Sequence, residues 1–222
     1  LIIFFLIFKP KVNLKKNFKV QIIRSILMVT ATSFMFYSLQ KFDLVDIYVV
    51  FFTAPLIVSL LSAYFLKDIL STKGILLMLL SFGSIVYSLG PSMRIFSLDL
   101  IFPIVPPICW ALYQFFTKVV SGDNDPFAAI FYTSILGAII FSIFIFFNWV
   151  PLEKNIFWLY LVILGVAGFI SHSLIIYAIQ LSNLSFVTNF QYSQLVWSTI
   201  INFLIFDVPF DYNKIVGVIG IC

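Results

Sequence analysis

The stretch that decides the fold covers residues 155–206 and reads NIFWLYLVILGVAGFISHSLIIYAIQLSNLSFVTNFQYSQLVWSTIINFLIF. It contains no Asp, Glu, Lys or Arg. A bilayer core needs about 20 predominantly apolar residues per helix, so this stretch is long enough for two spans. Its residues are continuously apolar rather than alternating, which argues against a transmembrane barrel. α-Helices then remain as the way to pair every backbone amide in lipid.

The rest of the chain repeats this pattern. Apolar residues make up 62% of the chain and charged residues 10%, whereas a soluble domain carries roughly a quarter charged residues. The sequence therefore predicts an all-α polytopic membrane protein. We expect helices near 1–8, 22–40, 47–66, 74–91, 99–117, 127–148, 156–181, 185–206 and 214–222. Both ends of the chain fall inside apolar runs, so we expect a chain truncated at both ends, with eight or nine helices present.

The positive charges indicate a topology rather than a nucleic-acid partner. Five lysines of this +4 chain fall between residues 9 and 19, in one loop beside a span. If the helices alternate in direction, one face of the membrane holds nine Lys and Arg residues and the other holds four. Cytoplasmic loops collect Lys and Arg, so we expect the nine-residue face to be inside.

An internal repeat predicts how the helices are organised. FYSLQ at 36–40 lies 140 residues before IYAIQ at 176–180, and each is followed by a short linker and an apolar helix. The helix with the second copy is the fifth predicted span after the helix with the first, an odd offset, so the two copies would cross the membrane in opposite directions. Inverted repeats of this kind are typical of secondary transporters. The alternative is chance similarity between apolar helices.

Several short motifs resemble those of EamA-type transporters of the drug/metabolite transporter superfamily. In the first half they are Arg24, FYSLQ, APL at 54–56 and YFLKD at 64–68. In the second half they are WALYQFFTK at 110–118, HSLIIYAIQ at 172–180 and QYSQLVW at 191–197. Asp68 stands where the family usually has Glu.

The resemblance implies a ten-helix bundle of two five-helix inverted repeats, with a central substrate cavity between them. Residues 1–91 would form the first repeat, without its first helix and part of its second. Residues 99–222 would form the second repeat, with its last helix cut.

The predicted helix 185–206 carries the strongest candidate site. In a continuous helix with about 100° per residue, its polar side chains form one stripe within about 80° of arc. The stripe consists of Gln191, Gln194, Ser198 and Asn202, flanked by Tyr192 and Trp197. Such a stripe can bind a neutral or zwitterionic solute without burying a full charge, and the aromatic rings could stack on a planar group. Interhelical hydrogen bonding is the alternative interpretation.

Other candidates lie elsewhere in the predicted spans. His172, the only histidine, could carry a proton or simply bond a neighbouring hydroxyl. Pro55 interrupts a predicted span and could form a hinge or only a packed kink. Further candidates for the cavity are Tyr37, Gln40, Tyr113, Gln114, Tyr177 and Gln180, for which structural hydrogen bonding is the alternative.

These features favour a secondary transporter of a small organic metabolite, working by alternating access. All nine acidic residues fall in predicted loops or at helix ends, so we expect a facilitator, an exchanger, or coupling through the missing first helix. An integral membrane enzyme acting on lipid-linked substrates needs clustered acid–base or metal residues, and none are seen. A non-transporting scaffold would not require the repeat.

We expect no enzymatic activity, no cofactor and no metal. Cys109 and Cys222 lie in apolar segments without metal or redox spacing. The expected partners are a small-molecule substrate and the lipid bilayer, with a homodimer as a further option and no nucleic acid. The expected location is the plasma (inner) membrane of a bacterium.

Overall fold

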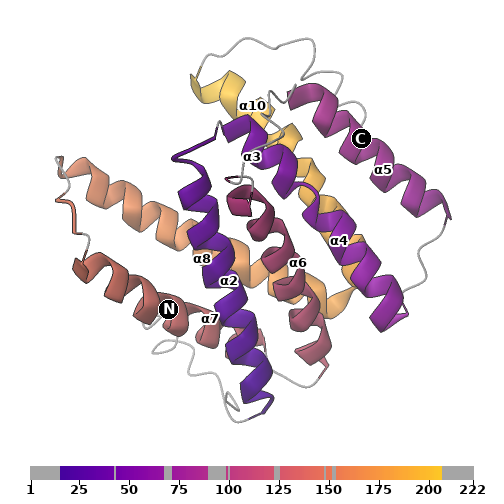
Figure 1. Cartoon of the computed structure of the whole chain (residues 1–222), viewed down its shortest axis with the longest axis horizontal. Coiled ribbons are helices and arrows are strands. Elements are labelled where there is room, and N and C mark those ends of the chain that lie inside the picture. Colours follow the sequence, from indigo (N-terminus) through magenta and orange to yellow (C-terminus); the bar gives the residue numbers. More distant parts are fainter. Residues whose placement is uncertain are drawn as a thin grey trace. The chain divides into compact units, whose positions relative to one another are not determined.

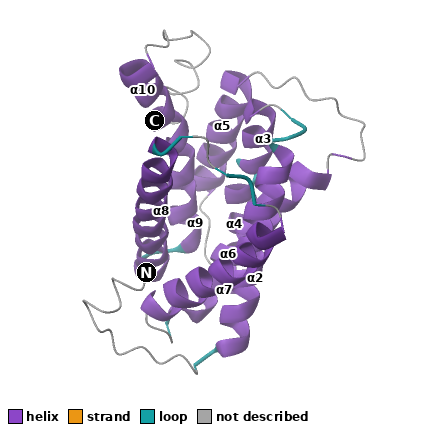
Figure 2. Ribbon diagram, turned by 90° about the vertical axis from the view of Figure 1, so that its left-hand side faces the viewer, coloured by secondary structure: helices purple, strands orange, loops and turns teal. Residues whose placement is uncertain are grey.

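A computed structural model describes residues 16–42, 44–67, 72–89, 99, 101–122, 126–147, 149–151 and 154–206. Within these residues every regular element is helical (Figure 2). The chain divides into two compact units. The first unit consists of residues 1–29 and 116–182, and the second consists of residues 30–115 and 183–222.

The first unit contains two long apolar helices, α7 (Pro126–Phe147) and α8 (Ile156–Leu181), which pack side by side (Figure 1). Pro126 starts α7, where its missing N–H costs no hydrogen bond. Ala129, Ile130 and Ile176 form the core between the two helices. The first part of α2 (Phe18–Ser38) and the end of α6 (Ile101–Ser121) complete this unit.

The second unit contains the shorter, interrupted helices. Its elements are α3 (Leu44–Phe51), α4 (Ala54–Leu61), η1 (Ser62–Leu66), α5 (Thr72–Leu89), α9 (Leu184–Asn189), η3 (Phe190–Ser193), α10 (Gln194–Phe206), and the remaining parts of α2 and α6. α4 packs against α9, and α3 packs against α5. Phe52, Met78 and Tyr192 form a buried core cluster.

The structure confirms the all-helical membrane class. Four segments are long and apolar enough to cross a bilayer: 18–38, 47–66, 126–147 and 156–181. The described residues form seven helical segments, two of them interrupted, which is fewer than the eight or nine predicted. The helices expected at 1–8 and 214–222 lie outside the described residues.

The predicted helix 47–66 is interrupted at residues 52 and 53. α3 ends at Phe51 and α4 begins at Ala54, with Pro55 in its first turn. Proline cannot donate a hydrogen bond to the residue four positions earlier, which is Phe51. The Thr53 amide instead bonds the Val50 carbonyl (3.0 Å), and its hydroxyl bonds the same oxygen (2.7 Å). The expected interruption near Pro55 is therefore present, and its role as a hinge stays a prediction.

The predicted helix 185–206 also differs from a continuous α-helix. Residues Phe190–Ser193 form a 3₁₀ turn between α9 and α10, although this segment contains neither glycine nor proline. The Ser193 hydroxyl donates to the Phe190 carbonyl (2.7 Å), and the Thr188 hydroxyl donates to the Ser185 carbonyl (3.2 Å). Hydroxyl groups that bond backbone carbonyls in this way compete with the helical pattern. The Ser193 bond lies within the tighter turn and the Thr188 bond just before it.

The two interrupted segments have the same layout along the chain. α3 starts at Leu44 and α9 at Leu184, and the helices resume at Ala54 in α4 and Gln194 in α10. Both pairs are separated by 140 residues, as FYSLQ and IYAIQ are. In Figures 1 and 2 the α3 end of one segment and the α10 end of the other lie at the top, so the segments run in opposite directions. The division of the whole chain into two repeats stays a prediction.

Candidate functional site

The candidate site is built on one face of α6. Trp110, Tyr113 and Gln114 follow one another at the spacing that places side chains on the same side of a helix. Tyr113 and Gln114 are fully buried, and Trp110 is half-buried. The rings of Trp110 and Tyr113 are stacked, with centroids 5.4 Å apart and planes 22° apart. This aromatic pair fixes the orientation of the Trp110 indole.

A chain of side-chain hydrogen bonds joins α6 to the 3₁₀ turn between α9 and α10. The Trp110 indole N–H donates to Gln191 Oε1 (3.3 Å), and Gln191 Nε2 donates to Gln114 Oε1 (2.8 Å). Gln114 Nε2 has no hydrogen-bond partner in the part of the chain that the structure describes. Because a buried amide without a partner is costly, this nitrogen is suited to donate to an oxygen of a bound molecule.

The interruptions of both segments meet at this site. The Phe51 ring lies 6.2 Å from the Trp110 ring, and Gln191 is bonded to the same indole. Phe51 and Gln191 are 140 residues apart and therefore occupy the same position in the two segments. The next residues, Phe52 and Tyr192, contact each other directly, with ring centroids 6.1 Å apart. The two segments are thus in contact through equivalent residues.

The first unit contains a buried arginine. Arg24 is fully buried, and its guanidinium donates to the Thr117 hydroxyl (3.0 Å), the Thr133 hydroxyl (2.8 Å) and the Ala129 carbonyl. These bonds connect α2, α6 and α7. Next to Thr117, the Lys118 ammonium donates to two carbonyls at the end of α8, those of Ile179 (2.9 Å) and Ser182 (2.7 Å). Both cations thus hold helices of this unit together.

Comparison with known protein families decides the identity. The model of the EamA-like transporter family matches residues 1–90 and 98–222, nearly the whole chain. The chain belongs to this family. This EamA-like protein is accordingly an integral membrane protein of a transporter family. Among curated proteins, no sequence matches the chain.

The stripe proposed for this EamA-like transporter does not lie on a single α-helix. Gln191 and Tyr192 lie in the 3₁₀ turn, half-buried and buried respectively, and Gln191 belongs to the α6 network. Gln194 and Trp197 lie on α10 and are exposed. The side chains of Ser198 and Asn202 lie outside the described residues. A 3₁₀ turn advances about 120° per residue, so the angles of a straight α-helix do not apply here.

The remaining candidates fall in different parts of the EamA-like fold. On α8, His172, Tyr177 and Gln180 are half-buried, and the Tyr177 ring meets Phe127 edge-on at 6.1 Å. At the end of α2, Tyr37 and Gln40 are exposed, and the Tyr37 ring lies 4.5 Å from the ring of Phe102. The structure brings Tyr113, Gln114 and Gln191 together in one unit, and α8 belongs to the other unit.

Three residues that sequence reasoning did not select also have defined positions. Trp110 bonds Gln191, Arg24 bonds three groups in the first unit, and Asn189 lines a pocket with α5. In the sequence Arg24 served as a topology signal and a motif residue at the start of the predicted helix 22–40, and its burial was missed because α2 begins four residues earlier, at Phe18.

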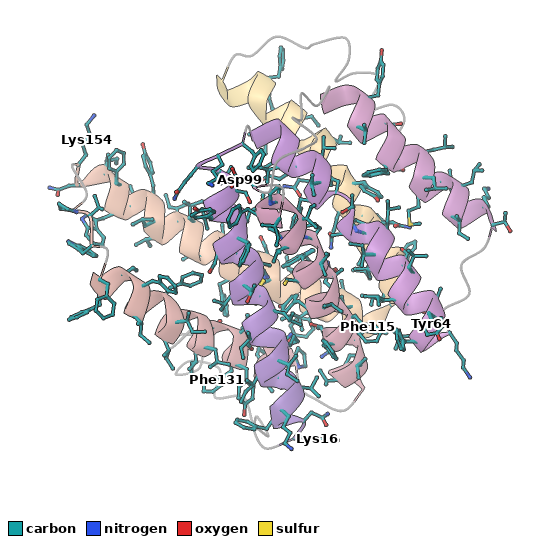
Figure 3. The ribbon with its side chains drawn as sticks, in the orientation of Figure 1. Lys16, Tyr64, Asp99, Phe115, Phe131 and Lys154 are labelled. Carbon is teal, nitrogen blue, oxygen red and sulfur yellow. The ribbon has the colours of Figure 1, made fainter. Side chains whose placement is uncertain are left out.

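An exposed ion pair lies at the end of α2. The Lys41 ammonium donates to Asp99 Oδ1 at 2.6 Å, and Asp99 is labelled in Figure 3. The hydrogen bond to Asp99 and the attraction of its charge raise the pKa of Lys41 above the ordinary value of 10.5. The pair is therefore intact at neutral pH and is lost as the pH rises through the raised pKa of Lys41.

We expect Asp99→Asn to lower the pKa of Lys41 toward 10.5, because the carboxylate that stabilises the ammonium is gone. NMR titration of isotopically methylated lysines measures this change. Asp99→Glu, which keeps a carboxylate, is the matched control. A Lys41 pKa that is the same in wild type and Asp99→Asn would contradict the pairing.

Within the described residues, no group of three His, Cys, Asp or Glu side chains lies close enough to hold a metal ion. The described site instead consists of amide, indole and phenol groups. Such groups can bind polar atoms and aromatic faces of an organic molecule.

Proposed function

We propose that this EamA-like protein moves a small organic metabolite across the membrane by alternating access, with the Trp110–Gln191–Gln114 network in contact with the substrate. The observation that carries the proposal is the meeting of the two interrupted segments at this network. Discontinuous helices form the substrate sites of many secondary transporters, because their broken backbone is tolerated only where it lines a cavity or is buried in protein.

The polar and aromatic groups of the network suit a neutral or zwitterionic solute. The unpartnered Gln114 Nε2 can donate to a carbonyl or carboxylate oxygen. Trp110 offers an aromatic face next to this donor, which suits a planar or apolar group. The proposed setting is the inner membrane of a bacterium, with the bilayer and the solute as partners and a homodimer as a further option.

Alternating access requires the two segments to change their geometry at the interruptions. The flexible points would be residues 52–53 before Pro55 and the 3₁₀ turn Phe190–Ser193. Phe52 and Tyr192 would form the contact at which the segments move past each other, because they occupy equivalent positions and their rings touch. A change at one interruption would then be transmitted to the other.

Transport by the full-length protein in proteoliposomes tests the proposal. The probes are labelled amino acids, nucleosides, sugars and vitamins, each measured by counterflow against the unlabelled compound. We expect at least one class to accumulate in a protein-dependent and saturable way. No counterflow of any probe by a folded, inserted protein would contradict the proposed substrate class.

The interruption at Pro55 gives a second test. We expect Pro55→Ala to slow the maximal transport rate several-fold while raising the thermal midpoint, because α3 and α4 can then join into one continuous helix. Counterflow rates and melting in detergent measure the two effects. A variant that is more stable and transports at the wild-type rate would show that the kink serves packing alone.

A further inference from the structure

A groove lies between α5 and the segment of α9, η3 and α10, and none of Trp110, Gln191 and Gln114 lines it. It has a volume of about 480 Å³, within the usual size range of ligand pockets. On α5 it is lined by Gly74, Leu77, Met78 and Ser81, which form one stripe over about two turns. Gly74 lies near the start of this helix, so the groove extends from the helix end toward the interior of the span.

The opposite wall is aromatic. Phe186, Phe190 and Trp197 line it and remain 61%, 62% and 62% exposed. Asn189 and Ser193 are among the few polar groups, and the Ser193 hydroxyl already bonds a backbone carbonyl. From Phe186 to Trp197 the wall runs about 16 Å along the segment, about the thickness of one leaflet of the hydrocarbon core.

The groove is open, because its aromatic wall residues are more than half exposed, and the opposite face of α5 carries exposed leucines. Leu76, Leu79 and Leu80 are all more than half exposed on this helix, as expected for a surface in contact with lipid. An apolar groove that opens to lipid, and is as long as one leaflet, fits an acyl chain better than a water-soluble solute.

A positively charged side chain lies next to one end of the groove. Lys73 is exposed, precedes Gly74 and lies one turn before Leu77 on the same face of α5. Its ammonium group can reach the lipid–water interface near the groove end marked by Gly74. This placement is complementary to an anionic headgroup whose acyl chain occupies the groove.

We propose that the groove binds one anionic phospholipid, with an acyl chain between α5 and the Phe186–Trp197 wall and the phosphate beside Lys73. The site does not depend on the proposed transport mechanism. It would hold a specific lipid in addition to the lipids that surround the helices. A single lysine near the membrane surface gives about a five-fold preference for an anionic over a zwitterionic headgroup.

Quenching of Trp197 fluorescence by phospholipids with brominated acyl chains tests this site. The full-length protein is placed in phosphatidylcholine bilayers that contain increasing fractions of brominated phosphatidylglycerol or brominated phosphatidylcholine. The signal of Trp197 is the difference between wild type and Trp197→Phe. We expect half-maximal quenching at about five-fold lower mole fraction for phosphatidylglycerol.

Three variants complete the experiment. Lys73→Gln should abolish the preference for phosphatidylglycerol, and Ser81→Phe should reduce quenching by both lipids because its ring fills the groove. Lys154→Gln, at an exposed lysine labelled in Figure 3, is the matched control and should retain the preference. Equal quenching by the two lipids in wild type, or an unchanged preference in Lys73→Gln, would overturn the proposal.

Discussion

Gln191→Leu is expected to reduce transport about ten-fold while the protein remains folded. The substitution removes the acceptor for the Trp110 indole N–H and the donor to Gln114 Oε1, so both hydrogen bonds that Gln191 makes in the network are lost. One hydrogen bond contributes about 1 kcal/mol, and 1.4 kcal/mol corresponds to a factor of ten in rate. The loss of two such bonds at a substrate-binding network therefore accounts for an effect of this size. Counterflow in proteoliposomes measures it.

The control is Ser84→Ala on α5, which removes a hydroxyl that bonds only the Leu80 carbonyl of its own helix in the described structure. We expect this variant to transport within about two-fold of wild type, as for substitutions away from special features. If Gln191→Leu inserts and transports at the wild-type rate, the network does not contact the substrate and the substrate binds elsewhere.

Arg24→Lys is expected to lower the free energy of unfolding by about 3 kcal/mol. Arg24 is fully buried, and its planar guanidinium bonds three groups at once, two hydroxyls and one carbonyl. Lysine keeps the charge, but its shorter side chain ends in a single ammonium that cannot reproduce this fork. Hydrogen bonds from charged groups contribute about 1.5–3 kcal/mol each, so losing one or two gives the expected effect.

Denaturation in mixed micelles measures this difference. Lys19→Gln, at an exposed lysine in the first turn of the same helix, should change stability by no more than about 0.5 kcal/mol. An Arg24→Lys variant as stable as Lys19→Gln would mean that the three bonds contribute little to the fold.

Much of the fold follows from the sequence because lipid imposes simple constraints. α8 covers the predicted residues 156–181, since Lys154 and Asn155 precede the apolar run and Ser182 and Asn183 follow it. α7 begins one residue before its prediction because Pro126 marks its start. Pro55 predicted the interruption between α3 and α4 because proline removes a backbone donor.

The second interruption was not predictable in the same way. The segment Phe190–Ser193 contains only residues that a continuous helix tolerates, and the turn is accompanied by hydroxyl–carbonyl bonds that a sequence pattern does not reveal. The prediction of one continuous helix therefore placed Gln191 and Gln194 on the same face. In the structure Gln191 bonds the α6 network and Gln194 is exposed.

The site network depends on packing between distant parts of the chain. Gln191 lies 77 residues from Gln114 and 81 from Trp110 in sequence. The sequence did identify Gln114, Tyr113 and Gln191 as polar or aromatic groups in spans, where such side chains are costly. Which of them meet is decided by how α6 packs against the 3₁₀ turn, and periodicity within one helix contains no information on that packing.

Cross-linking of the two interruptions tests the central claim most directly. In a background without the native cysteines, Phe52→Cys and Tyr192→Cys are combined and joined by a short, cleavable thiol cross-linker, since the two rings are only 6.1 Å apart. If the segments must move against each other during transport, counterflow stops on cross-linking and returns when the link is cleaved. Counterflow at the full rate with the link intact would contradict alternating access at this pair.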